Sequence, residues 1–96
     1  MNIDEVKQKT KAIFEQYGIL SAGVFGSIAR GDYNDESDVD LMVTLGRPMG
    51  MFDYMRFIDS LEAVVKRKVD IVTDKSINQR VKPFILKDLT TIYERG

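Results

Sequence analysis

Apolar residues recur at near-helical spacing in two stretches of the chain. The first stretch runs from Asn2 to Tyr17, and its apolar stripe consists of Ile3, Val6, Ile13, Phe14 and Tyr17. Asn2 and Glu5 suit a capping box at its start, and Gly18 suits its end. The second stripe consists of Phe52, Met55, Ile58, Leu61, Val64 and Val65. The pattern predicts two amphipathic helices whose apolar stripes belong to the core.

Shorter apolar runs, rich in β-branched residues, predict strands. Three of them are expected to be strands of the core, at residues 19–25, 39–45 and 68–73. Thr90 to Tyr93 favour a final strand, although a helix running on to Arg95 is an alternative. The remaining segments predict, in chain order, a helical turn at 27–30, an exposed loop at 31–37 and a helix between 76 and 88.

This order of elements predicts a fold of the α+β (α/β two-layer) class. Its mixed β-sheet would have three to four or five strands, with helices packed on it. A length of 96 residues suits one compact domain. We therefore expect a single domain spanning residues 1–96.

Composition narrows the chemistry that is available. The chain has no cysteine and no histidine, so carboxylates, hydroxyls, Lys and Arg are its reactive groups. Its 14 basic and 15 acidic residues give a formal charge of -1, so polymeric nucleic acid is not expected as a partner. No apolar run approaches the ~18 residues of a membrane span. We predict a cytoplasmic protein with no membrane partner.

The first candidate for chemistry is the Gly26-Ser27 pair, at the end of the strand predicted for residues 19–25. Gly26 permits close approach of the backbone, and Ser27 begins a helical turn whose unpaired N–H groups can face a phosphate. A Gly-Ser pair is also common at ordinary helix starts. Taken alone, the Gly26-Ser27 pair is better explained as an ordinary helix N-cap than as a phosphate-binding site.

The second candidate is the pair Asp38 and Asp40. Separated by one residue on a strand, their carboxylates share a face and lie about 6.6 Å apart along the chain. Val39, Leu41 and Val43 take the opposite face, where they can pack on a helix. This arrangement suits the binding of a metal ion. The alternative explanation is that the two aspartates form a solvated acidic edge.

Asp70, between Val69 and Ile71, favours the metal-binding explanation over the solvated acidic edge. It lies in a strand with the pattern of a buried one, where an unpaired carboxylate is costly. If the second and third strands are neighbours, Asp38, Asp40 and Asp70 form one cluster of hard oxygen ligands suited to Mg²⁺ or Mn²⁺. The alternative is a salt bridge from Asp70 to one of three nearby cations, Lys66, Arg67 or Lys68.

Together these motifs resemble a known family. Phe25-Gly26-Ser27, the run Asp38-Val39-Asp40-Leu41 and the later Val69-Asp70-Ile71 are similar to the DNA polymerase β-type nucleotidyltransferase superfamily. Gly-Ser-Ile-Ala-Arg-Gly-Asp at 26–32 and Ser-Asp-Val-Asp-Leu at 37–41 resemble its minimal nucleotidyltransferase (MNT) group. The resemblance implies the polymerase β-like fold and catalysis by Asp38, Asp40 and Asp70.

The resemblance also implies cofactors and a donor. Asp38, Asp40 and Asp70 would ligate two Mg²⁺ ions, with Mn²⁺ as an alternative, and ATP or another nucleoside triphosphate would be the donor. The family pattern assigns the nucleotide to Gly26, Ser27, Arg30 and Ser37, with Arg30 near the leaving pyrophosphate. An arginine at a helix end is equally often a surface cap.

Larger members of the superfamily carry further domains that grip the acceptor, and we expect this chain to depend on a partner for it. The resemblance suggests an antitoxin that neutralises a HEPN ribonuclease toxin by AMPylating it, by binding it, or both, in a homo- or hetero-oligomer. A non-catalytic module that occludes its partner is the main alternative. An enzyme that modifies a small molecule such as an antibiotic is a third hypothesis.

Overall fold

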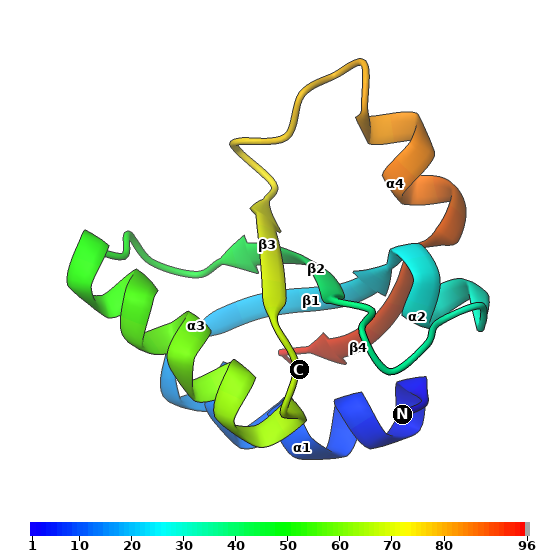
Figure 1. The fold of residues 1–96 in the computed structure, drawn as a ribbon. Coiled ribbons are helices and arrows are strands. Elements are labelled where there is room, and N and C mark those ends of the chain that lie inside the picture. Colours follow the sequence, from blue (N-terminus) through cyan, green and yellow to red (C-terminus); the bar gives the residue numbers. More distant parts are fainter. Residues whose placement is uncertain (96) are drawn as a thin grey trace.

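The computed structural model of the protein describes residues 1–95. Within them a four-stranded mixed sheet has the order β3-β2-β1-β4 (Figure 1). The elements in chain order are α1 (Ile3–Gln16), β1 (Ile19–Phe25), α2 (Gly26–Arg30), β2 (Val39–Leu45), α3 (Met51–Val65), β3 (Val69–Thr73), α4 (Lys82–Asp88) and β4 (Thr90–Glu94). Among these helices, none combines the length and the apolar character needed to cross a membrane.

The core lies between the sheet and the two long helices, α1 and α3, which cover one face of it (Figure 1). Alternation along β2 directs Val39, Leu41 and Val43 to this face, and all three are fully buried. Phe14 of α1 and Phe57 of α3 are also fully buried, with ring centroids 6.1 Å apart. Removal of these side chains from water is the main favourable contribution to folding.

Sheet topology brings three strand ends together. β1 is antiparallel to both β2 and β4, whereas β2 and β3 are parallel and joined through α3. Parallel neighbours begin at the same edge of a sheet, so β2 and β3 begin side by side. The carboxyl end of the antiparallel β1 lies at that edge as well, and this is where the predicted site residues occur.

The predicted elements are largely confirmed, but Phe52 and Met55 of the second apolar stripe are exposed, so their predicted place in the core is wrong. β1 and β2 have the predicted bounds, β3 begins at Val69, and the last segment is a strand, so the alternative helix toward Arg95 is wrong. The Asn2 side chain accepts a hydrogen bond of 2.9 Å from the Glu5 N–H at the start of α1. Gly18 follows that helix with a φ of 68°, a backbone conformation that favours glycine.

Candidate active site

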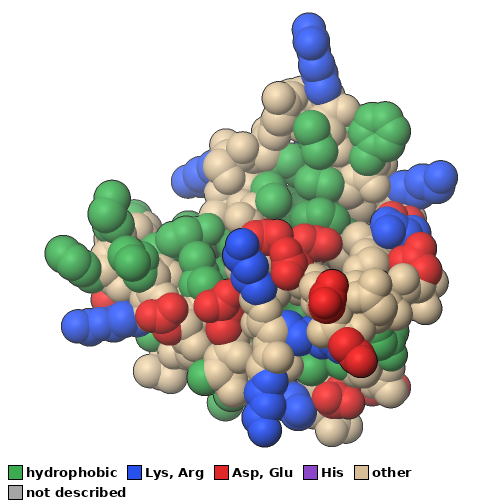
Figure 2. All heavy atoms as spheres, viewed as in Figure 1, with side chains coloured by type: hydrophobic (Ala, Val, Ile, Leu, Met, Phe, Trp, Pro, Cys, Tyr) green, Lys and Arg blue, Asp and Glu red, His purple; other side chains and the backbone are tan. Residues whose placement is uncertain are grey.

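The three predicted carboxylates lie at one edge of the sheet. Asp40 on β2 and Asp70 on β3 are register partners in the parallel ladder, so the prediction that these strands are neighbours is confirmed. Asp38 comes immediately before β2, and Phe25, at the end of β1, pairs with Asp40. The turn at Gly26 is therefore next to the aspartates. Acidic side chains gather near the centre of this face, below a hollow lined with hydrophobic side chains (Figure 2).

Gly26 is required here for two physical reasons. Its φ of 74° lies in the left-handed region that favours glycine. A Cβ at this position would also overlap the carboxylate of Asp40. Gly26 was expected to permit close approach of the backbone, and in the structure the side chain packed against it is Asp40. Ser27 follows within α2, and its carbonyl accepts hydrogen bonds from the backbone N–H groups of Gly31 and Asp32, at 2.9 and 3.2 Å.

Asp40 is the carboxylate of this site whose pKa is shifted by its surroundings. It is half-buried, and burial raises the pKa of its carboxyl group. The negative charges of Asp70 and Asp38 raise this pKa further, whereas Arg30 acts in the opposite direction. A bound cation would stabilise this site, because it would offset the burial and the neighbouring charges that disfavour ionised Asp40.

Asp70 is exposed, so the expectation that its carboxylate is buried is wrong. The reason is its position: β3 is an edge strand, and Asp70 does not point toward the helical layer that buries Val69. The alternative of a salt bridge to Lys66, Arg67 or Lys68 is also wrong. The ion pairs within residues 1–95 involve other acidic groups.

No three acidic side chains within residues 1–95 lie close enough, as they stand, to form a metal-binding group. The donor chemistry nevertheless fits a divalent ion, because carboxylate oxygens suit Mg²⁺ and Mn²⁺. The charge fits too, since Asp38 and Asp70 already disfavour ionised Asp40. Ligation by all three residues therefore requires their side chains to rotate toward one another from neighbouring backbone positions.

Arg30 and Ser37, the other predicted nucleotide-binding residues, make contacts within the protein. Arg30 donates through Nε to Asp32 at 3.1 Å and through Nη1 to Asp88 at 3.0 Å. The Ser37 hydroxyl accepts a hydrogen bond of 2.9 Å from the Asn34 backbone N–H. Sequence reasoning assigned no role to Asp88, which ties α4 to α2. Its partner is 58 residues away in the chain, a separation that no local pattern can signal.

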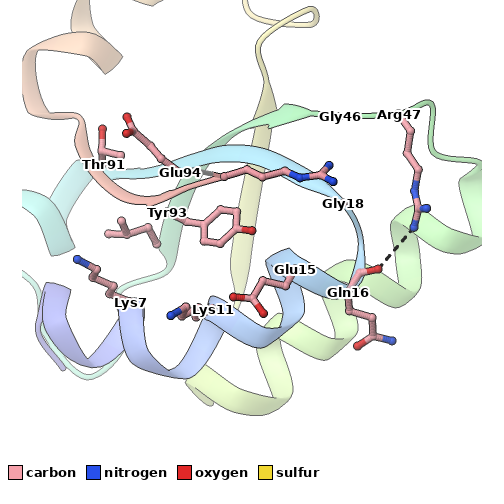
Figure 3. A pocket seen from close by; sticks show the side chains of 12 residues that line it. Lys7, Lys11, Glu15, Gln16, Gly18, Gly46, Arg47, Thr91, Tyr93 and Glu94 are labelled. Carbon is pink, nitrogen blue, oxygen red and sulfur yellow. Dashed lines mark hydrogen bonds between the residues drawn. The ribbon is translucent and has the colours of Figure 1, made fainter.

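Two hollows differ in their relation to the carboxylates. A groove of about 540 Å³ lies beside Gly26, between the end of β1 and α4, and its apolar lining consists of Phe25, Val81, Phe84 and Ile85. A larger hollow of about 870 Å³ lies between α1 and β4 (Figure 3), and none of the predicted site residues lines it. Its side chains come mainly from a helix surface and a sheet edge. We place the candidate active site at the carboxylates, because the groups suited to phosphate and metal chemistry lie there.

The fold and the aspartate-bearing edge together define a class of enzyme. The chain belongs to the polymerase β nucleotidyltransferase family, because the family described as "Polymerase beta, Nucleotidyltransferase" matches residues 8–96, a range that includes every predicted site residue. The protein is thus a nucleotidyltransferase, and the resemblance to this superfamily is confirmed.

Two proteins with similar sequences are named as protein adenylyltransferases. A Methanocaldococcus jannaschii protein named "Putative protein adenylyltransferase" is 35% identical over 92 residues, 96% of this chain and 99% of that protein. The "Protein adenylyltransferase MntA" of Thermococcus cleftensis is 28% identical over 82 residues, 85% of this chain and 83% of that protein.

A solved structure shares the fold. It is that of the tri-AMPylated Shewanella oneidensis HEPN toxin in complex with MNT antitoxin. One of its chains has a TM-score of 0.73 and 13% identity to this chain, covering 97% of this chain and 73% of that one. The predicted polymerase β-like nucleotidyltransferase fold is confirmed.

Proposed function

We propose that this chain is a metal-dependent protein adenylyltransferase. It transfers AMP from ATP to a hydroxyl group of a HEPN-type toxin in the cytoplasm and so acts as the antitoxin. The observation that carries the proposal is the placement of Asp38, Asp40 and Asp70 on neighbouring strand ends beside the Gly26 turn. Two relatives named protein adenylyltransferases support the choice of donor and acceptor. The fold shared with a chain of the HEPN–MNT complex is consistent with the choice of partner.

In the proposed reaction, Asp38 and Asp40 would hold the cations, and Asp70 would help to hold one of them. Two bound Mg²⁺ or Mn²⁺ ions would stabilise negative charge on the attacking and leaving oxygens. Ser27 and the backbone amides next to Gly26 receive the β- and γ-phosphates. The acceptor oxygen forms a bond to the α-phosphorus while the bond to the pyrophosphate oxygen breaks. The hydroxyl proton passes to water at the open edge, where Asp70 is exposed.

Arg30 and Ser37 have lesser parts in this proposal. Arg30 is exposed and already paired with Asp32 and Asp88, so it neutralises the pyrophosphate by exchanging one of these ion pairs. Ser37 precedes Asp38 directly, and its hydroxyl offers a further polar contact to the nucleotide.

The test incubates the purified chain with α-labelled ATP, Mg²⁺ and a HEPN-domain protein from the same organism as the candidate toxin. Label and intact mass of the toxin report transfer of AMP. The double variant Asp38→Asn with Asp40→Asn should lower the rate about a thousandfold or more, because metal stabilisation of the transition state contributes several kcal/mol. Asp53→Asn with Asp59→Asn, which changes two exposed aspartates of α3, is the matched control and should retain activity.

Undiminished transfer by the Asp38→Asn, Asp40→Asn variant would refute the catalytic assignment. If the wild-type chain transfers no AMP, but the wild-type chain and the Asp38→Asn, Asp40→Asn variant both block the toxin's ribonuclease activity, the chain acts by occlusion. Transfer to an aminoglycoside in the absence of any protein partner would instead indicate a small-molecule enzyme.

A further inference from the structure

We propose that Arg67 is a positioning residue for nucleotidyl transfer: it holds the backbone at Asp38 at a set distance from the strand that carries Asp70. The inference rests on the proposed function, which assigns both aspartates to the same cation site. Sequence reasoning considered Arg67 only as an ion-pair partner of Asp70, and the structure gives it different contacts.

Arg67 lies between α3 and β3, and its side chain reaches the loop that precedes β2. Its Nη1 donates hydrogen bonds to two backbone carbonyls of that loop, Asn34 at 2.7 Å and Ser37 at 2.9 Å. Its guanidinium also lies over the ring of Tyr33, 5.7 Å from the ring centroid. These contacts join segments about thirty residues apart in the chain.

The bond to Ser37 acts directly on Asp38, because this carbonyl belongs to the peptide group that joins the two residues. The peptide group on the other side of Asp38 is held as well, since the Val39 N–H donates to the Lys68 carbonyl at 2.9 Å. Each peptide group is planar, so only the two torsions at Asp38 separate them. Residues 67 and 68, consecutive in the chain, therefore hold both sides of Asp38, and β3 carries Asp70 two residues later.

The loop is itself a closed turn, which makes this attachment effective. Within it, the Asn34 side chain accepts from the Glu36 N–H at 2.8 Å, and the Ser37 hydroxyl accepts from the Asn34 N–H at 2.9 Å. These bonds give the turn its shape but do not attach it to the sheet. Arg67 supplies that attachment, and a planar guanidinium stacked on Tyr33 loses less freedom on bonding than a lysine would.

The attachment matters because the acidic side chains do not form a ready-made metal group. Side-chain rotation can bring the ligands together only if the backbone separation of Asp38 and Asp70 suits a shared ion. An anchored backbone lowers the cost of ordering the site when the ion binds. Without Arg67, Asp38 would move with its turn, and metal affinity and kcat should fall while KM for the protein acceptor changes little.

The test compares Arg67→Met, Arg67→Lys and the control Lys68→Met. The control removes a neighbouring exposed cation that takes part in none of the ion pairs within residues 1–95. In the metal-free protein, amide hydrogen exchange of residues 33–38 should become about tenfold faster in Arg67→Met and stay unchanged in the control. Calorimetry with Mn²⁺ and a non-hydrolysable ATP analogue should show about 10- to 100-fold weaker binding in Arg67→Met, the usual loss when a partner of a metal ligand is removed.

Arg67→Lys keeps the charge and one donor, so it should restore part of both losses. It also provides the same measurements if Arg67→Met fails to fold. Unchanged exchange in the Arg67 variants, or an equal loss of Mn²⁺ affinity in Lys68→Met, would overturn the positioning role. If the wild-type chain binds no Mn²⁺ at all, the proposed function fails and the positioning role fails with it. If the wild-type chain binds Mn²⁺ and Arg67→Met binds it equally well, only the positioning role is refuted.

Discussion

The two faces of β2 come from one strand and have opposite physical character. On the helical face, Val39, Leu41 and Val43 are fully buried and complete the core. On the open face, Asp40 is half-buried beside Asp70 and Asp38, and its burial, together with their negative charges, raises the pKa of its carboxyl group. One strand thus carries much of the stability on one side and the candidate chemistry on the other, because successive side chains point to opposite faces.

The difference shows how a small domain can tolerate a destabilising site. Grouped carboxylates oppose folding in the absence of a cation, and the packed face offsets that cost. Since the two faces contact different groups, substitutions on the helical face should leave the chemistry of the site largely unchanged, and substitutions on the open face should leave the packing of the core largely unchanged. The following three predictions measure what each face contributes to stability, starting with the largest expected effect.

Leu41→Ala should have the largest effect. Leu41 is fully buried, and truncating such a leucine typically costs about 2–5 kcal/mol through lost burial and a cavity. Denaturant unfolding measures the loss, and the remaining folded protein should keep its rate of AMP transfer. Met42→Ala, on the open face of the same strand, is the control and should cost less than half as much. Equal losses at the two positions would break the comparison between the faces.

Gly26→Ala should come next, at roughly 1–3 kcal/mol, because it combines a left-handed backbone with overlap on the Asp40 carboxylate. Gly31→Ala is a matched control, since Gly31 has a φ of 82° and no atom within 4 Å of its added Cβ. Thermal unfolding should therefore show a smaller loss for Gly31→Ala. In an Asp40→Ala background the excess loss at Gly26 should shrink, and an undiminished excess would argue against the overlap.

The smallest effect concerns pH. Because the folded-state pKa of Asp40 is raised above its ordinary value of 3.8, the native state holds this proton more tightly than the unfolded state does. As pH rises through 3.8 toward the raised value, the wild-type protein should lose stability relative to Asp40→Asn. Above that window the gap should stay constant. Unfolding free energies measured across acidic pH check this, and a gap that does not vary with pH would contradict it.

Much of the fold could be predicted because its signals are local. The bounds of β1 and β2 follow from apolar runs that end at Gly26 and begin after a polar loop, and both strands are confirmed. The alternation around Val39, Leu41 and Val43 predicted which side of β2 is buried. The short α4 was placed only within a wide interval, because its seven residues form too few turns to give a clear periodic pattern.

The relative placement of the candidate site residues was predictable from the sequence, but their environment was not. The motifs placed Asp38, Asp40 and Asp70 together, and the ladder register confirms that the latter two are opposite one another. Burial of Asp70 was predicted wrongly, because the pattern of a strand does not show whether it is central or at the edge of the sheet. The contacts of Arg67 were missed for a similar reason, since they join a turn and a connection about thirty residues apart.

The sequence by itself determined the types and spacing of the reactive groups: carboxylates, a Gly-Ser turn, and neither histidine nor cysteine. It also determined the strand alternation that separates Asp40 from the core, because that periodicity is a property of the backbone. Only the tertiary structure decided that Asp40 rather than Asp70 is the more buried carboxylate, that Gly26 makes room for it, and that Arg67 holds Asp38. Burial and long-range hydrogen bonds depend on which segments become neighbours, and strand order and packing decide that.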